Sequence, residues 1–318
     1  MEYKITFISQ KPTCFINRDG THLPVDLAQQ CALKAFNFHY SQINDIDNDF
    51  DIIILLIPKT PEDRESLFNF DLVELAKKKS KKVLFMQEGP AWIFQDLPLH
   101  QQFWHYNVLA SVDGILCENK TDIPYFKGLV PNKPVFDIPS VMIEENILQY
   151  KKNKKEDKVM IGGNFVRWYG GFDSYVVSQE FEVPIFAPSM GRKIDGEEQI
   201  HDLTHFPYMN WNKWIETLSS FKYAIHLMPT IAAGTFAMNC GFLGLPCVGY
   251  EEADTQRIIH PNLSVKIGDL ESARKLCQKL KNDEEFYKNC STESLENYQK
   301  YYSEKVFIKN MKERFLAC

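Results

Sequence analysis

The chain has 318 residues, of which 44% are apolar and 25% charged, and this length suits two ordinary domains. It contains only 15 glycines and 16 prolines, which excludes a collagen-like or disordered chain. The net charge of −6 argues against a protein that coats nucleic acid by bulk electrostatics, although it is compatible with a local basic groove.

The sequence also carries no sign of a membrane span, a signal peptide or a disulfide framework. No apolar run reaches the roughly 20 residues of a transmembrane helix, and the N-terminus (MEYKITFIS) does not resemble a secretory signal. The eight cysteines are scattered without CxxC spacing. We therefore expect a cytoplasmic protein with reduced, buried thiols.

Strand-like and helix-like segments alternate through the first half of the chain. The segments 50–57 (FDIIILLI) and 82–86 (KVLFM) are apolar on both faces, which is typical of buried parallel strands. Further strands are predicted at 3–9, 114–117 and 135–138, and helices at 25–36, 61–79 and 99–110. This alternation predicts βαβ units and a mostly parallel, doubly wound sheet.

A polar run at 151–158 (KKNKKEDK) interrupts this pattern, which then restarts. Strands are predicted at 159–163, 183–186, 223–227, 246–248 and 262–267, and helices at 211–220, 235–243, 270–280 and 291–315. We therefore predict an α/β protein with two doubly wound, Rossmann-like domains, at 1–150 and 151–290, and a C-terminal helix in 291–318. In such sheets, ligands bind beyond the carboxyl ends of the strands.

The strongest local motif is the segment 223–248 (YAIHLMPTIAAGTFAMNCGFLGLPCV). A strand ends at a proline, small residues follow, and a helix is expected to begin near Thr235. Free N–H groups at a helix start, with little side-chain bulk around them, suit a phosphate or diphosphate. The candidate contacts are Thr230, Ala233, Gly234 and Thr235. The alternative is that the small residues only allow close packing of helix and sheet.

This motif resembles the nucleotide-sugar-binding signature of GT-B-fold glycosyltransferases. The resemblance rests on Pro-Thr-x-x-x-Gly at 229–234 and Gly-Leu-Pro-Cys-Val at 244–248. The two glutamates of the family signature fall on Ile231 and Asn239, so both carboxylates are missing and Asn239 is the remaining candidate for a donor hydroxyl. The resemblance implies two Rossmann-like domains facing a cleft, with a C-terminal helix that crosses back to the N-terminal domain.

The same resemblance implies further donor contacts. The segment 159–167 (VMIGGNFVR) is similar to the strand and Gly-x-Arg loop that open the family's donor domain, so we expect Gly163 and Arg167 beside the diphosphate. The alternative for Arg167 is an exposed loop arginine. In the loop before the helix at 211–220, the resemblance implies that Tyr208 or Met209 flanks the nucleobase, and core packing is the alternative. The remaining candidates are Lys213 for a phosphate and Asp254 for the sugar.

Two loops of the N-terminal half offer groups that could remove a proton from an acceptor. They follow predicted strands and contain Asp19, His22 and Glu88, which are suitable general bases. Asp19-Gly20 is equally a plain turn signal. The spacing His201-x-x-x-His205 could suit zinc, but no third ligand lies nearby and Pro207 disrupts a helix. No metal site is therefore expected.

Together these residues predict an enzyme that moves a sugar from a nucleotide-sugar donor to an acceptor hydroxyl without an essential metal. The donor expected from the family is a UDP-sugar, with no other cofactor. The acceptor stays open among a glycan, a small molecule and a hydroxymethylated DNA base, the last by resemblance to bacteriophage DNA glycosyltransferases. Two alternatives remain: a GT-B-fold nucleotide-sugar epimerase, and a non-catalytic nucleotide- or sugar-binding protein with two α/β lobes.

Overall fold

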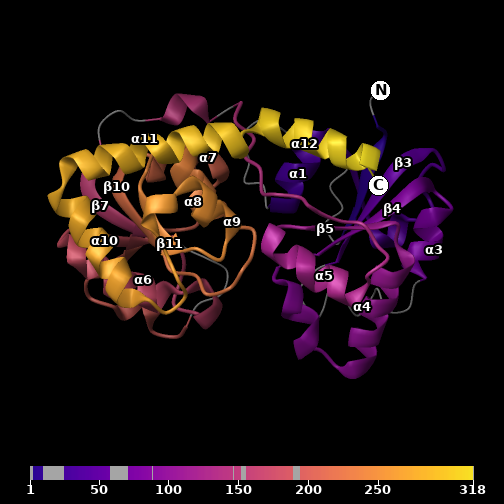
Figure 1. The fold of residues 1–318 in the computed structure, drawn as a ribbon, viewed down its shortest axis with the longest axis horizontal. Helices are drawn as coiled ribbons and strands as arrows, with labels where there is room; N and C mark the ends of the chain where they lie inside the picture. Colours follow the sequence, from indigo (N-terminus) through magenta and orange to yellow (C-terminus); the bar gives the residue numbers. More distant parts are fainter. Residues whose placement is uncertain are drawn as a thin grey trace. The chain divides into compact units, whose positions relative to one another are not determined.

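The computed structural model describes residues 3–9, 25–57, 71–87, 89–145, 147–151, 155–188 and 194–317, which form two α/β units (Figure 1). The first unit contains the described residues up to Val141 together with those from Phe307 onward. The second unit runs from Met142 to Val306. Each unit is built around its own parallel sheet of six strands.

The sheet of the first unit has the strand order β2-β1-β3-β4-β5-β6, and all its neighbouring strands are parallel. Its strands are β1 (Ile5–Ser9), β2 (Phe36–His39), β3 (Phe50–Ile57), β4 (Ser80–Gln87), β5 (Gly114–Cys117) and β6 (Val135–Asp137). Its helices are α1 (Val25–Leu33), α3 (Leu72–Lys77), α4 (Leu99–Ser111), α5 (Ile123–Leu129) and α12 (Glu304–Ala317).

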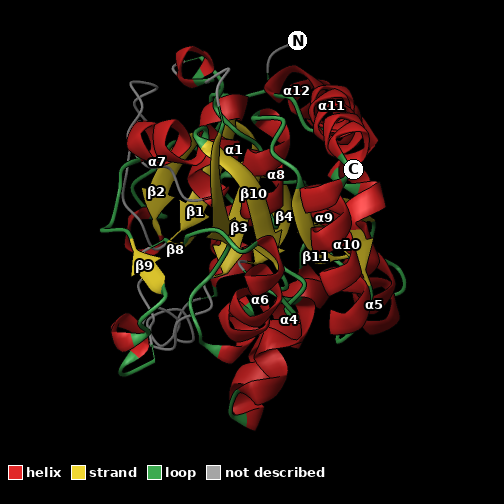
Figure 2. Cartoon of the chain, turned by 90° about the vertical axis from the view of Figure 1, so that its left-hand side faces the viewer, coloured by secondary structure: helices red, strands yellow, loops and turns green. Residues whose placement is uncertain are grey.

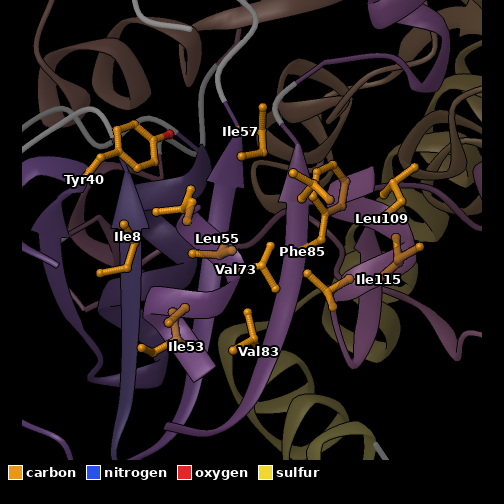
Figure 3. Close-up of a cluster of buried hydrophobic side chains, with 14 of the residues drawn as sticks. Ile8, Tyr40, Ile53, Leu55, Ile57, Val73, Val83, Phe85, Leu109 and Ile115 are labelled. Carbon is orange, nitrogen blue, oxygen red and sulfur yellow. The ribbon is translucent and has the colours of Figure 1, made fainter. Parts of the chain in front are cut away.

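The two central strands of this sheet carry the core. In β3, Ile53, Leu55 and Ile57 are buried on the face where Val83 and Phe85 of β4 also lie (Figure 3). The intervening residues of β3 are buried as well, because helices cover both faces of a doubly wound sheet. This accounts for the continuous apolar runs in the sequence.

Helix α12 completes the first unit from the far end of the chain. Its side chains Phe307, Met311 and Phe315 are buried. Arg314 Nη2 donates to Asp137 Oδ2 of β6 at 2.7 Å, and the Phe315 ring lies edge-on to Tyr3, with 6.2 Å between centroids. The crossing of the C-terminal helix to the N-terminal domain is therefore confirmed.

The core of the first unit contains an uncharged histidine that makes folding sensitive to acid. His105 of α4 stacks on Phe94, with 3.7 Å between ring centroids, and burial lowers its pKa to about 3. In the unfolded chain the His105 imidazole binds a proton near pH 6.5, and in the folded chain it does not. The free energy of unfolding therefore falls as the pH drops below 6.5. Between pH 7 and pH 5, we expect the free energy of unfolding to fall by about 2 kcal/mol less in His105→Phe than in the wild type.

Urea unfolding of the wild type and of His105→Phe at the two pH values measures this difference. The exposed His100 supplies the control, because His100→Gln removes a histidine from the same helix without removing a buried imidazole. An equal loss of stability between pH 7 and pH 5 in His105→Phe and the wild type would contradict the assignment.

The sheet of the second unit has the strand order β12-β11-β10-β7-β8-β9 and is also parallel throughout. Its strands are β7 (Glu156–Ile161), β8 (Ile185–Ala187), β9 (Leu203–His205), β10 (Phe221–His226), β11 (Cys247–Tyr250) and β12 (Ser264–Val265). Its helices are α6 (Gly171–Ser178), α7 (Trp211–Leu218), α8 (Thr235–Phe242), α9 (Asp254–Ile259), α10 (Leu270–Asn282) and α11 (Glu284–Tyr301).

Alternate residues of the central strands point to opposite faces of this sheet. Val159 and Ile161 of β7 pack in the cluster that contains side chains of α6 and α10. Met160, between them, packs in the cluster that contains side chains of α7, α8 and α11, and Figure 1 shows α11 running past α8. The predicted doubly wound architecture is confirmed for both sheets.

The structure differs from the predicted elements at several places, and the short helices α5 and α9 were not predicted. The helix expected at 25–36 ends at Leu33 because Lys34 adopts φ +53°, and β2 follows it. Strand β9 was not predicted, since only three residues form it. The single helix expected at 291–315 is two helices, and the N–H of Glu304 at the start of α12 donates to Glu144 Oε1 at 3.0 Å instead of to a carbonyl of α11.

The units also divide at other residues than the predicted 150 and 290. Met142 and Ile147 pack in the core of the second unit, with Tyr298 of α11. The Tyr298 hydroxyl donates to Glu144 Oε1 at 2.7 Å. These contacts place the first boundary at 141/142 and the second at 306/307.

Two further observations concern the cysteines and the membrane. The described cysteines are all buried thiols that form no disulfide with one another: Cys31, Cys117, Cys240, Cys247, Cys277 and Cys290. Among the helices of the described residues, none combines the length and the apolar character that a bilayer crossing requires.

Candidate functional site

The candidate site lies at the carboxyl edge of the second sheet, where β11, β10 and β7 are neighbours. The loops that leave these strands are 251–253, 227–234 and 162–166. Because neighbouring parallel strands end at the same edge, these loops lie side by side. The predicted donor contacts Gly163, Arg167 and Thr230–Thr235 are therefore brought together at one edge of the sheet.

The loop that carries Arg167 packs tightly against the end of β10. Gly170 follows it with φ +65°, and a Cβ atom there would lie 1.8 Å from the carbonyl oxygen of Leu227. Only glycine allows this approach. Arg167 itself is exposed, and no ion pair to it occurs within the described ranges. Its guanidinium is thus available to an anionic ligand.

Helix α8 begins at the same edge. Its N-cap Gly234 has φ +63°, and the first intrahelical bond runs from the Met238 N–H to the Gly234 carbonyl at 3.3 Å. The N–H groups before Met238 therefore have no acceptor inside the helix. A Cβ at Gly234 would lie 1.9 Å from Thr255 Oγ1, so the missing side chain lets α8 begin directly against the first turn of α9.

Buried polar atoms without a partner occur at this edge of the sheet: in the loops at Asn164 and Glu252, at the end of β10 and in the first turn of α9. Asn164 is 1% exposed and Thr255 3%. Across the described part of the chain, neither the Asn164 amide nor Thr255 Oγ1, Glu252 Oε2 or His226 Nε2 has a hydrogen-bond partner. Burial lowers the pKa of His226 to about 4, so its imidazole is neutral at pH 7. Such groups are costly unless a ligand or water satisfies them.

Sequence reasoning missed these polar groups. It named neither Asn164 nor His226 as a contact, and of the segment 251–256 that it expected at the sugar it singled out only Asp254. Their common signal is position, because each follows or ends a strand at the carboxyl edge. A polar residue directly after a buried parallel strand is therefore worth testing even when no motif includes it.

Two predicted contacts are engaged in bonds within the second unit. Asn239 is 4% exposed. In the amide orientation that satisfies both polar atoms, Nδ2 donates to the Thr235 carbonyl at 3.0 Å and Oδ1 accepts from Trp214 Nε1 at 2.9 Å. Asp254 is 5% exposed and forms an ion pair with Arg257. Their roles in donor binding stay predictions, and each would have to give up a present partner.

The loop expected at the nucleobase leaves β9, which is two strands away from β7 and beside β8 (Figure 2). Tyr208 is 69% exposed. Met209 Sδ accepts from the Thr217 hydroxyl at 3.3 Å, and Lys213 Nζ pairs with Glu216 Oε2 at 3.0 Å. The structure thus places these residues at the same edge of the sheet, in and after the loop that follows β9.

The three predicted general bases, Asp19, His22 and Glu88, lie outside the described residues. β4 ends at Gln87, directly before Glu88 in the chain, and Gln87 Nε2 donates to the Pro90 carbonyl at 2.8 Å. No group of three possible metal ligands occurs among the residues that the structure describes. The two histidines that suggested zinc have other partners: His201 pairs with Asp202 and His205 with Glu197.

Comparisons with known proteins identify the fold. No protein-family model matches the sequence, and no curated protein matches it. An alpha-glucosyltransferase solved with UDP-glucose and DNA containing an abasic site has 12% identity and a TM-score of 0.68, and the match covers 98% of each chain. HepE from Anabaena, solved with UDP and glucose, has 8% identity and a TM-score of 0.70 over 99% of this chain and 100% of that one.

A third structure, sucrose-phosphate synthase from Thermosynechococcus elongatus, has 12% identity and a TM-score of 0.63 over 84% of this chain and 73% of that one. The first two likenesses cover nearly the whole of this chain. The chain therefore has the two-domain GT-B fold of glycosyltransferases, as its sequence motifs predicted.

Proposed function

We propose that the protein is a glycosyltransferase that moves a sugar from a nucleotide-sugar donor to an acceptor hydroxyl. The observation that carries this proposal is the set of buried polar atoms after or at the ends of β7, β10 and β11 that have no partner among the described residues. They lie at the same edge as Arg167 and the start of α8. The fold supports the proposal, because the similar structures include two solved with UDP or UDP-glucose.

In this proposal the donor diphosphate binds at the start of α8, where backbone N–H groups and the helix dipole favour an anion. Arg167 supplies a cation with a bidentate geometry that matches phosphate oxygens. The neutral imidazole of His226 and the amide of Asn164 add hydrogen bonds. These groups stabilise the negative charge that collects on the diphosphate as the bond to the sugar breaks.

A base must take the proton of the acceptor hydroxyl as the new glycosidic bond forms. We assign this role to Glu88, with Asp19 and His22 as the other candidates. We further propose that the donor is a UDP-sugar and that transfer needs no divalent cation. Turnover that persists in excess EDTA supports transfer without a divalent cation. Turnover that is lost in EDTA and restored by Mg²⁺ or Mn²⁺ contradicts it.

A ligand-stabilisation screen tests the proposed donor. We expect millimolar UDP and one UDP-sugar to raise the melting temperature, because a ligand that binds only the folded state stabilises by about 2.7 kcal/mol at 100 times its Kd. GDP, ADP and CMP with their sugars serve as comparisons. The glycosyltransferase proposal fails if no nucleotide or nucleotide sugar shifts the transition.

An acceptor screen then separates transfer from simple binding. The panel includes water, simple glycosides and duplex DNA with 5-hydroxymethylated pyrimidines, since the similar alpha-glucosyltransferase was solved with DNA, in one case containing an HMU base. Release of UDP with transfer of sugar to any acceptor excludes the binding-only alternative. Donor binding without turnover on any acceptor would instead favour it.

A further inference from the structure

A buried carboxylate lies behind the loop that carries Arg167. Glu197 belongs to the short 3₁₀ helix η7 (Glu197–Gln199), between β8 and β9, and its side chain is 1% exposed. Burying a carboxylate is costly unless it accepts hydrogen bonds. The burial of the Glu197 carboxylate in the second unit therefore needs an explanation.

Glu197 bonds to the β7 loop, to the end of β9 and to its own β8–β9 connection. Its Oε2 accepts from the backbone N–H of Phe165 at 3.1 Å and from that of Ile194 at 3.3 Å. Its Oε1 lies 3.1 Å from Nε2 of His205, at the end of β9. One side chain thus ties the β7 loop to the β8–β9 connection and to the end of β9.

The bond to Phe165 is made two residues before Arg167. On the other side of Arg167, Gly170 fixes the loop against Leu227. The short 3₁₀ turn that holds Arg167, η5 (Arg167–Tyr169), therefore lies between two anchors. The Gly170 anchor is backbone packing, and the Phe165 anchor is the Glu197 carboxylate.

We propose that Glu197 is a positioning residue, which holds the β7 loop so that Arg167 and the Asn164 amide face the donor. This inference rests on the proposed function for its link to the donor, but not for the anchoring itself. Glu197 touches neither Arg167 nor the proposed donor, and it acts through the backbone of Phe165.

The experiment compares Glu197→Ala with the conservative variant Glu197→Gln. The glutamine oxygen can still accept from both backbone N–H groups, and its NH₂ group keeps a hydrogen-bonding group beside His205. The matched control is Glu144→Ala, which removes another carboxylate of the second unit that accepts from one backbone N–H and one side chain. Glu144 contacts Tyr298, which packs on Phe242 at the other end of α8.

The first readout, hydrogen exchange of peptides covering 162–169, needs no ligand. We expect Glu197→Ala to raise exchange in this segment about tenfold or more, while Glu197→Gln and Glu144→Ala leave it unchanged. Unchanged exchange in Glu197→Ala, or equally raised exchange in Glu144→Ala, overturns the anchoring role. This readout decides the anchoring even if the wild type binds no nucleotide and the proposed function fails.

The second readout is UDP affinity by calorimetry. We expect Glu197→Ala to weaken UDP binding about tenfold or more, Glu197→Gln to restore most of the loss, and Glu144→Ala to bind like the wild type. Wild-type UDP affinity in Glu197→Ala overturns the link to the donor. So does a loss that glutamine does not restore although exchange of 162–169 is normal.

Discussion

Replacing Arg167 by alanine is expected to weaken UDP binding about 10- to 100-fold, the usual value of a charge-assisted hydrogen bond. Arg167 is exposed and forms no ion pair with the described residues, so its loss leaves no buried partner behind. The free energy of unfolding without ligand should change by less than about 0.5 kcal/mol. Calorimetric titration with UDP and urea unfolding measure the two quantities.

The matched control is Arg274→Ala. Arg274 lies on α10 of the same unit and pairs with Glu180, near the C-terminal end of α6, so this variant removes the same charge away from the carboxyl edge. Its UDP affinity should equal that of the wild type. If both variants lose UDP affinity equally, Arg167 contributes only to the overall electrostatic potential of the protein. Its assignment to the diphosphate is then wrong.

Gly170→Ala is expected to lower the free energy of unfolding by about 3 kcal/mol or more. Alanine at φ +65° is strained, and its Cβ would lie 1.8 Å from the Leu227 oxygen and 2.6 Å from the Leu227 carbonyl carbon. Neither backbone atom can move without shifting the end of β10. Urea unfolding and UDP titration should therefore both report a loss.

The variant Gly268→Ala separates the cost of backbone strain at positive φ from the cost of the steric clash with Leu227. Gly268 has φ +84°, but a Cβ there would meet no atom within 4 Å. We expect it to cost only about 1 kcal/mol, from backbone strain alone. Equal costs at the two positions would show that the approach of Gly170 to Leu227 does not restrict the fold.

The sheets were predictable because local pattern and tertiary environment agree in them. Strands β3 and β5 have the predicted bounds, since runs that are apolar on both faces suit only strands covered on both sides. The start of α8 at Thr235 was equally clear, because Pro229 ends the strand and Gly234 can adopt the left-handed conformation that precedes the helix. The GT-B fold then follows from two such sheets and the returning helix.

The rest of the site depends on contacts between residues far apart in the sequence. Asn239 was expected to face a donor hydroxyl, but Trp214 and the Thr235 carbonyl now occupy its amide, and no spacing rule gives the position of a tryptophan on another helix. Glu197 lies in a polar stretch that contains no motif. Its burial becomes evident only when the β7 loop and the end of β9 converge on it.

The return of the chain to its first unit has a consequence for biosynthesis. Phe307, Met311 and Phe315 fill the first unit, yet the ribosome makes them after every residue of the second. A nascent chain can thus close its second sheet while the first still lacks a covering helix and displays apolar surface to water. Chaperones that recognise such surface should bind the elongating polypeptide longest at its N-terminal portion.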